Sequence, residues 1–309
     1  MELALYHPLH GYYHAGLERI GKRGDYLTSP LISPLFGATL ARFIRQAFDR
    51  GIPRRILELG AGDGSLAEQL VGLAPYGIVE RSPDFRARQQ QRLGDRARWL
   101  EEVPAGFQGL VLSNELLDAL PVHRVDGDGE LLVGWDGGFA EQWGPFSTPR
   151  IAEYFDRLEL RPAGRAEVNL DAQSLMAGVY GCMGRGLVLT IDYGYEAEEL
   201  FLRHPQGTFL TYFRHALGDN PYGRVGLQDM TSHVDFTSLM RLGESLGLRT
   251  VQLATQAEFL IEHGIGELLM EVQRGAIEPA DYYRAREAVT TLLNPAGMGG
   301  FRVLVQDKA

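Results

Sequence analysis

The sequence has almost no cysteine, no long apolar run and a shortage of basic residues. Its single cysteine, Cys182, excludes an internal disulfide and fits a reducing compartment. No stretch reaches transmembrane length, and the N-terminus has neither a signal-peptide pattern nor an Arg- and Ser-rich presequence. We therefore expect no membrane segment, and a location in a bacterial cytoplasm or, as the second choice, a processed form in an organelle matrix. The excess of 40 acidic over 30 basic residues argues against general nucleic-acid binding and favours cationic partners.

A glycine turn between an apolar run and a helical pattern stands out in the segment RILELGAGDGSLAEQL, residues 55–70. The apolar run is typical of a buried strand, and Leu66 and Leu70 lie on one helix face. Gly60, Gly62 and Gly64 let the backbone turn tightly and approach a ligand closely. A lone Gly-x-Gly can be a simple strand-to-helix turn, so the acids around this one decide its interpretation.

Acids lie on both sides of the turn. Glu58 precedes it, and Glu80 ends the next apolar run about 20 residues later, where nucleotide-binding sheets place the carboxylate that binds a ribose. Asp63 would crowd a phosphate, which disfavours a dinucleotide and hence a dehydrogenase. The Glu-x-Gly-x-Gly-x-Gly spacing instead resembles the first motif of S-adenosylmethionine-dependent methyltransferases, whose cofactor is cationic. The predicted cofactor-binding residues here are Glu58, Gly60, Ala61, Gly62, Gly64, Glu80 and Arg81, with Glu101 (or Glu102) as an acceptor for the adenine amino group.

A second group of polar residues follows the buried strand at residues 110–112, in GLVLSNELLDALPVHRV. The strand exit carries Asn114, Glu115 and Asp118, and ligands of open α/β sheets gather at the carboxyl ends of strands. Asn114 as a helix cap and Asp118 as a solvated acid would be the plain alternative. We predict that these side chains belong to the site.

Strands and helices alternate along most of the chain, which predicts an α/β fold with a parallel sheet. We expect one domain over residues 1–309, with an N-terminal loop and helix (1–50) packed over the cofactor cleft. Residues 121–170 read as a hairpin-rich insertion lobe, and 204–236 as a substrate-side insertion too long for an idle connection. The histidines His204, His215 and His233 lack the spacing of a zinc site, so we predict no metal.

Several motifs stand in a recognisable order: GYY, GDYLTSP, LELGAGDGSLA, SNELLDALPV, IDYGY and QDMTSHVDF. In this order the chain resembles the MidA-like methyltransferase family, whose mitochondrial members act as complex I assembly factors. The resemblance implies a class I methyltransferase fold, a Rossmann-like sheet with helices on both faces, and S-adenosylmethionine as methyl donor. It adds Asp25 and Thr28 of the N-terminal loop and Asn114 to the cofactor site. Where the family carries a glutamate after Pro30, this chain has Leu31.

The resemblance also implies a protein arginine as the methyl acceptor. A guanidinium stays protonated and delocalised, so carboxylates must hold it, and we predict Glu115 and Asp118 in this role. His233 or Asp235 would accept the departing proton. Two other functions stay open at this point: a small-molecule methyltransferase, and a cofactor-binding assembly factor without turnover. The sequence predicts a protein partner and leaves a homo-oligomer open.

Overall fold

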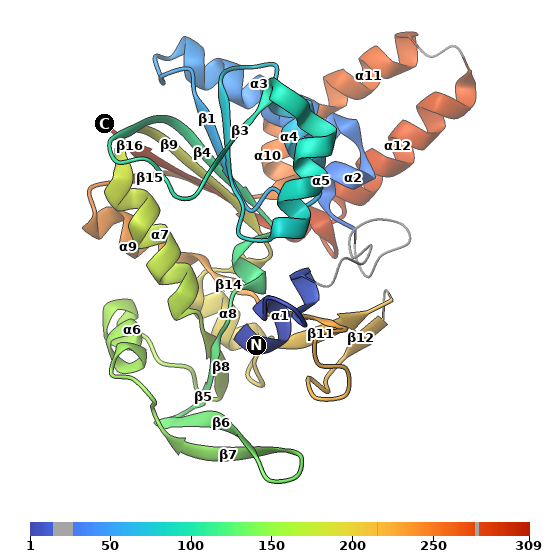
Figure 1. The fold of residues 1–309 in the computed structure, drawn as a ribbon. Helices are drawn as coiled ribbons and strands as arrows, with labels where there is room; N and C mark the ends of the chain where they lie inside the picture. Colours follow the sequence, from blue (N-terminus) through green and yellow to red (C-terminus); the bar gives the residue numbers. More distant parts are fainter. Residues whose placement is uncertain (15–26, 215, 276–277) are drawn as a thin grey trace.

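A seven-stranded sheet forms the centre of the computed structural model, which describes residues 1–14, 27–214, 216–275 and 278–309 (Figure 1). The strand order is β15-β16-β9-β4-β1-β2-β3, and the five strands from β9 to β3 are parallel. The strands are β1 (Ile56–Leu59), β2 (Tyr76–Val79), β3 (Arg98–Leu100), β4 (Phe107–Asn114), β9 (Met183–Asp192), β15 (Arg249–Thr255) and β16 (Arg302–Lys308). This confirms the predicted class I methyltransferase fold.

The strand β16 runs against its neighbours, which the prediction of a parallel sheet did not include. It pairs antiparallel with both β9 and β15, and Arg302 lies opposite Asp192. The chain therefore enters β16 at the edge of the sheet where β9 ends. This brings Phe301, the residue just before the strand, to the carboxyl edge of the parallel strands.

Helices cover both faces of the sheet because its strands are apolar on both sides. Ile56 of β1 packs into a core with α3 (Pro34–Asp49), α4 (Ser65–Leu70), α5 (Pro83–Leu93), α10 (Gln256–Glu262), α11 (Ile265–Gly275) and α12 (Pro279–Leu293). Leu57 and Leu59 point to the other face and pack with α7 (Leu170–Cys182) and α9 (Phe236–Ser245). This alternation follows from the two-residue period of a strand.

A smaller antiparallel sheet occupies the range predicted as an insertion lobe. Its strand order is β7 (Phe139–Pro145), β6 (Gly129–Trp135), β5 (His123–Asp126) and β8 (Arg165–Val168). With α6 (Arg150–Leu158) it encloses a core of its own that includes Val125, Ile151 and Phe155. The role predicted for this lobe, shaping a substrate cleft, stays a prediction.

The remaining elements gather beside the carboxyl edge of the sheet (Figure 1). They are α1 (Glu2–Tyr6), η1 (Tyr12–His14), α2 (Ser29–Ile32), η3 (Leu117–Ala119), β10 (Gly194–Tyr195), α8 (Ala197–Arg203), β11 (Leu210–Phe213), β12 (Ala216–Gly218), β13 (Asp229–Thr231), β14 (Val234–Asp235) and η4 (Met298–Gly300). The short η2 (Gly94–Arg96) instead directly precedes β3, at the amino edge. Leu5 and Tyr12 of the N-terminal segment pack on Met230 of β13. Within the described ranges, no helix combines the length and apolar character needed to span a bilayer.

Candidate active site

The glycine turn after β1 adopts a backbone that L side chains rarely reach. Gly60, Gly62 and Gly64 have φ values of 62°, 55° and 80°. A Cβ atom on Gly60 would lie 2.6 Å from Cδ1 of Leu116. The turn therefore requires glycine at this position for two reasons, the left-handed φ and the close approach of the loop after β4.

A cavity of about 410 Å³ lies over this turn. Its lining includes eight of the predicted cofactor-binding residues: Thr28, Glu58, Gly60, Ala61, Gly62, Glu80, Arg81 and Asn114. Gly64 does not line the cavity and instead occupies the N-cap position of α4. Asp25 lies outside the described residues. The residues predicted from the sequence therefore line one cavity, and they come from the ends of three strands and from the N-terminal loop.

Glu101 is not part of this cavity, although an adenine contact was predicted for it. Its side chain is 84% exposed and forms an ion pair with Arg86 at 2.7 Å. The pair links the loop after β3 to α5 and leaves the carboxylate in solvent. Glu102 is also exposed and does not line the cavity.

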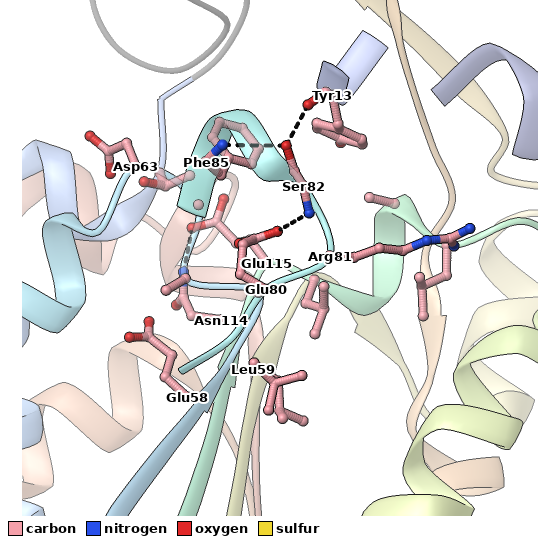
Figure 2. A pocket seen from close by; sticks show the side chains of 18 of the residues that line it. Tyr13, Glu58, Leu59, Asp63, Glu80, Arg81, Ser82, Phe85, Asn114 and Glu115 are labelled. Carbon is pink, nitrogen blue, oxygen red and sulfur yellow. Dashed lines mark hydrogen bonds between the residues drawn. The ribbon is translucent and has the colours of Figure 1, made fainter. Parts of the chain in front are cut away.

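Glu80 is held in the cavity wall by groups of the following turn and helix. Its carboxylate accepts a hydrogen bond from the Ser82 N–H at 2.9 Å (Figure 2). It accepts another from Nε2 of Gln89 at 2.9 Å. Burial is the main influence on its pKa and raises it. Each carboxylate oxygen keeps acceptor capacity for a ligand hydroxyl, because a carboxylate offers about four lone-pair sites.

Glu58 is a buried acid beneath the same cavity. It is 2% exposed, and its carboxylate accepts a hydrogen bond from the Tyr76 hydroxyl at 2.7 Å. Burial raises the pKa of Glu58 to about 8, while the hydrogen bond from Tyr76 acts in the opposite direction. A cation placed over Glu58 would favour its charged form.

Asp63 and Arg81 have partners that change how their charges act. The Asp63 carboxylate accepts hydrogen bonds from the N–H and hydroxyl of Ser65 and lies 3.1 Å from the Arg92 guanidinium. Its charge is thus partly balanced, which weakens the argument that Asp63 alone repels a phosphate. Arg81 points away from Glu80 and Glu115 (Figure 2) and pairs with Glu2 at 3.1 Å.

A second cavity of about 270 Å³ adjoins the first. The two share Tyr13, Glu115 and Ala119 as lining residues. The rest of the second lining is Leu27, Asp118, Tyr193, Tyr212, Asp229, Thr231 and Phe301. Among the described lining residues there are three acids and no lysine or arginine. This wall suits a cationic, partly planar group, since aromatic faces also attract cations.

Glu115 stands at the junction of the two cavities in a strained backbone. Its φ is 50°, which is uncommon for a residue with a side chain. Its carboxylate accepts a hydrogen bond from Nδ2 of Asn114 at 3.1 Å (Figure 2). It accepts another from the Ser29 N–H at 3.0 Å. Burial, reinforced by nearby Asp118, raises the pKa of Glu115 to about 7. Strain at such a position is typical of functional sites.

Asp118 is held by its contacts with β9 and the residue that follows the strand. The Tyr193 hydroxyl donates to the Asp118 carboxylate, and Asp192 accepts backbone N–H groups of Leu116 and Leu117 at 3.2 Å and 2.9 Å. Burial raises the pKa of Asp118 to about 6. Burial, reinforced by Asp118, also raises the pKa of Asp192. The loop carrying Glu115 and Asp118 is thus fixed to the end of β9.

The structure does not bring Asp235 to either cavity, although it was predicted to accept a proton. Asp235 caps α9, because its carboxylate accepts the Ser238 N–H at 3.2 Å, and it also accepts the buried Tyr154 hydroxyl. His233 also lines neither cavity, but its ring lies 5.4 Å from that of Tyr193. Burial lowers the pKa of His233 to about 4, so the ring is neutral at pH 7.

Sequence reasoning missed several residues of the second cavity. Asp229 and Thr231 lie two positions apart in β13 and therefore share one face of the strand. Tyr212 comes from β11, which pairs with β13. Tyr13 donates from its hydroxyl to Asp229 at 2.8 Å. The signal that could have found Asp229 and Thr231 was the two-residue period inside QDMTSHVDF.

Comparisons with known proteins identify the family. Residues 39–254 match the model of the family described as "Putative S-adenosyl-L-methionine-dependent methyltransferase". The mitochondrial protein arginine methyltransferase NDUFAF7 homolog of Drosophila melanogaster is 27% identical over 97% of this chain and 78% of its own length. The human protein arginine methyltransferase NDUFAF7 is 26% identical over 97% of this chain and 76% of its own length.

A solved structure agrees over the whole chain. A protein from Burkholderia thailandensis, crystallised with S-adenosylhomocysteine bound, is 34% identical and superposes with a TM-score of 0.90 over 99% of this chain and 86% of that one. A second structure, the native crystal structure of an uncharacterised protein from Burkholderia thailandensis, is 34% identical and superposes with a TM-score of 0.87 over 99% of this chain and 85% of that one. The chain belongs to the MidA-like family of S-adenosylmethionine-dependent methyltransferases.

Proposed function

We propose that this methyltransferase transfers the methyl group of S-adenosylmethionine to the guanidinium of an arginine in a protein substrate. The observation that carries the proposal is the second cavity, which meets the first at Glu115 and presents Glu115, Asp118 and Asp229 together. Carboxylates offer a guanidinium charge-assisted, bidentate hydrogen bonds. Names of relatives at 26–27% identity, which include protein arginine methyltransferases, support the same acceptor.

The larger cavity fits the methyl donor. Gly60 and Gly62 remove side chains where the ligand would approach the backbone, Glu80 offers acceptors to ribose hydroxyls, and Glu58 suits an ammonium group. When bound, S-adenosylmethionine supplies a methyl group on a cationic sulfur. The chain contributes alignment and the exclusion of water, which is most of what an in-line displacement needs.

The residues at the junction would hold and prepare the acceptor. A free guanidinium has a pKa above 12, so at pH 7 it arrives protonated and must lose a proton as the new bond forms. We assign Glu115 and Asp118 to hold the guanidinium, as predicted. In addition, we assign to Glu115 the acceptance of the released proton, because it lies at the junction of the two cavities and its raised pKa makes it a better base than an ordinary carboxylate. This assignment replaces the predicted acceptors His233 and Asp235, because neither lines a cavity and the oxygens of Asp235 serve α9 and Tyr154.

A labelling experiment tests the proposal. The protein is incubated with methyl-labelled S-adenosylmethionine and a bacterial lysate, and the products are separated into protein and small-molecule fractions before acid hydrolysis. Labelled methylarginine in the protein fraction is the expected result. Label in a metabolite would indicate a small-molecule methyltransferase instead. Cofactor binding in calorimetry without any labelled product would indicate an assembly factor without turnover. The variant Glu102→Gln, at an exposed acid outside both cavities, serves as the matched control for Glu115→Gln.

A further inference from the structure

The hairpin of β6 and β7 carries an exposed apolar face. The register pairs Trp135 with Phe139, Val133 with Glu141 and Leu131 with Trp143, so these side chains share one side of the hairpin. Trp135 is 70% exposed, and the other large apolar residues exposed on this side are Val133, Phe139 and Trp143. Exposed apolar clusters of this kind mark binding surfaces more often than isolated exposed residues do. We call the four exposed apolar residues Val133, Trp135, Phe139 and Trp143 the hairpin face.

The hairpin face contacts the segment that leads into β13, one of the strands that line the second cavity. The Tyr222 ring stacks on Phe139 at 5.0 Å, and its hydroxyl donates to Glu141 at 2.9 Å. Tyr222 lies in the segment between β12 and β13, and β13 supplies Asp229 and Thr231 to the cavity. The hairpin itself projects away from the central sheet (Figure 1). Tyr222 thus connects the hairpin face with the segment that leads into β13.

The charges around the hairpin face select a basic partner. Residues 121–147 contain five acids and one arginine. Glu130 is buried, Glu141 pairs with Arg124 at 3.3 Å, and Asp126 lies 3.7 Å from Arg165, whose guanidinium also lies over the Trp143 ring. The other exposed acids are Asp128, in the turn between β5 and β6, and Asp136, in the turn between β6 and β7. A basic segment with apolar side chains matches both properties of this surface, and it would carry the same sign of charge as the arginine proposed for the cavity.

The backbone of β7 offers a second kind of contact. In the order β7-β6-β5-β8 it is an edge strand, so one side of its backbone pairs with β6 and the other faces outward. An extended peptide can add to such an edge by main-chain hydrogen bonds, and side chains that alternate along it then meet the exposed face. This mode suits a segment that is unfolded when it binds.

We propose that the hairpin face binds an extended, basic segment of the substrate polypeptide that flanks the target arginine. The inference rests on the proposed function and adds where the substrate is recognised. Glu115 and Asp118 hold the arginine, while Trp135, Phe139 and the edge of β7 bind the neighbouring chain. Recognition outside the cavity would let the enzyme select a protein substrate over free arginine.

The double variant Trp135→Ser/Phe139→Ser tests this proposal. Leu202→Ser is the control, because Leu202 is 81% exposed on α8 and belongs to neither cavity nor the hairpin face. Initial rates of methylarginine formation are measured for lysate protein and for Nα-acetylarginine amide, a probe that reaches only the cavity. We expect the rate with protein to fall at least about tenfold in the double variant, as for the loss of aromatic anchors at an interface. The rate with the small probe, the affinity for S-adenosylhomocysteine and the melting temperature should stay as in the parent and the control.

Each other outcome overturns the docking proposal in a distinguishable way. An unchanged rate with protein in the double variant shows that the hairpin face does not recognise the substrate, while the proposed function stands. Equal losses with protein and small probe show a general defect of the site. If sedimentation shows a dimer that the double variant dissociates, the occupant is a second copy of this chain. If the parent protein forms no methylarginine from either acceptor, the proposed function itself fails.

Discussion

Replacing Glu115 by Gln separates the two roles assigned to this carboxyl. The side chain keeps its size and can still accept the Ser29 N–H through its amide oxygen. It loses the negative charge facing the guanidinium and the capacity to take its proton. Removing one partner of a buried charge pair typically costs about 2–4 kcal/mol, which corresponds to a loss of about 30- to 1,000-fold in kcat/KM for the acceptor.

The same substitution should stabilise the folded protein at alkaline pH. The pKa of Glu115 is raised from 4.5 to about 7, so ionisation is harder in the folded state than in the unfolded chain. At about 1.4 kcal/mol for each pH unit, this costs the parent protein at most about 3.5 kcal/mol above pH 7. The cost is absent below pH 4.5, develops as the pH rises toward 7, and does not exist in Glu115→Gln. The two proteins should therefore differ in stability at pH 8 and converge at pH 4.

The assay combines single-turnover methylation, urea unfolding at several pH values and calorimetry with S-adenosylhomocysteine. In the parent protein, kcat/KM should rise with pH as Glu115 and Asp118 lose protons near pH 7 and 6. In Glu115→Gln the residual activity should rise only near pH 6, where Asp118 loses its proton. A variant that binds cofactor normally, keeps full methyl transfer and shows the parental pH profile would refute the role of Glu115.

Three further predictions concern the walls of the site. Gly60→Ala would place a Cβ 2.6 Å from Cδ1 of Leu116 in a residue whose φ is 62°. The midpoint of urea unfolding should therefore fall by an amount equivalent to about 1–3 kcal/mol. An unchanged midpoint would show that the loop after β4 moves to accept the Cβ without cost. Glu80→Gln loses the charge and one of the two acceptor oxygens, so it can keep only one of the hydrogen bonds from Ser82 and Gln89, and calorimetry should show S-adenosylhomocysteine bound about tenfold more weakly. Unaltered affinity would show that Glu80 does not bind the ribose. Asp235→Ala should lower stability by about 1–3 kcal/mol, because α9 loses its cap and the Tyr154 hydroxyl its acceptor; the activity of each folded molecule should remain, and its loss would restore Asp235 as a catalytic candidate.

The parts of the fold and site that sequence could predict are those set by neighbouring residues. The strand at 56–59, the turn at Gly60 and the helix after it follow from local apolar pattern and glycine spacing. The strand exit with Glu115 could be predicted because parallel strands end at one edge of the sheet. These features depend on at most a few consecutive residues.

The parts that could not be predicted depend on pairing between distant segments. Asp229 and Asp235 lie six positions apart in one motif, yet β13 turns the first toward the cavity while the second caps a helix. Nothing local shows that β13 pairs with β11, which sets this orientation. Glu101 looked equally suitable for the cofactor, but Arg86 on α5 draws it into solvent. An acidic residue in a sequence motif predicts the kind of chemistry, but the motif does not show toward which part of the fold the side chain points.

Tyr13 connects the cavity of the methyl donor with that of the acceptor. Its carbonyl accepts the Ser82 hydroxyl at 2.7 Å beside the larger cavity, and its hydroxyl donates to Asp229 in the smaller one. One residue of the N-terminal segment is thus part of the wall of both cavities. A ligand in either cavity therefore meets the same residue, and a shift of Tyr13 caused by one ligand reaches the wall that the other ligand contacts. Coupling through Tyr13 must be reciprocal, so donor and acceptor change each other's affinity by the same factor.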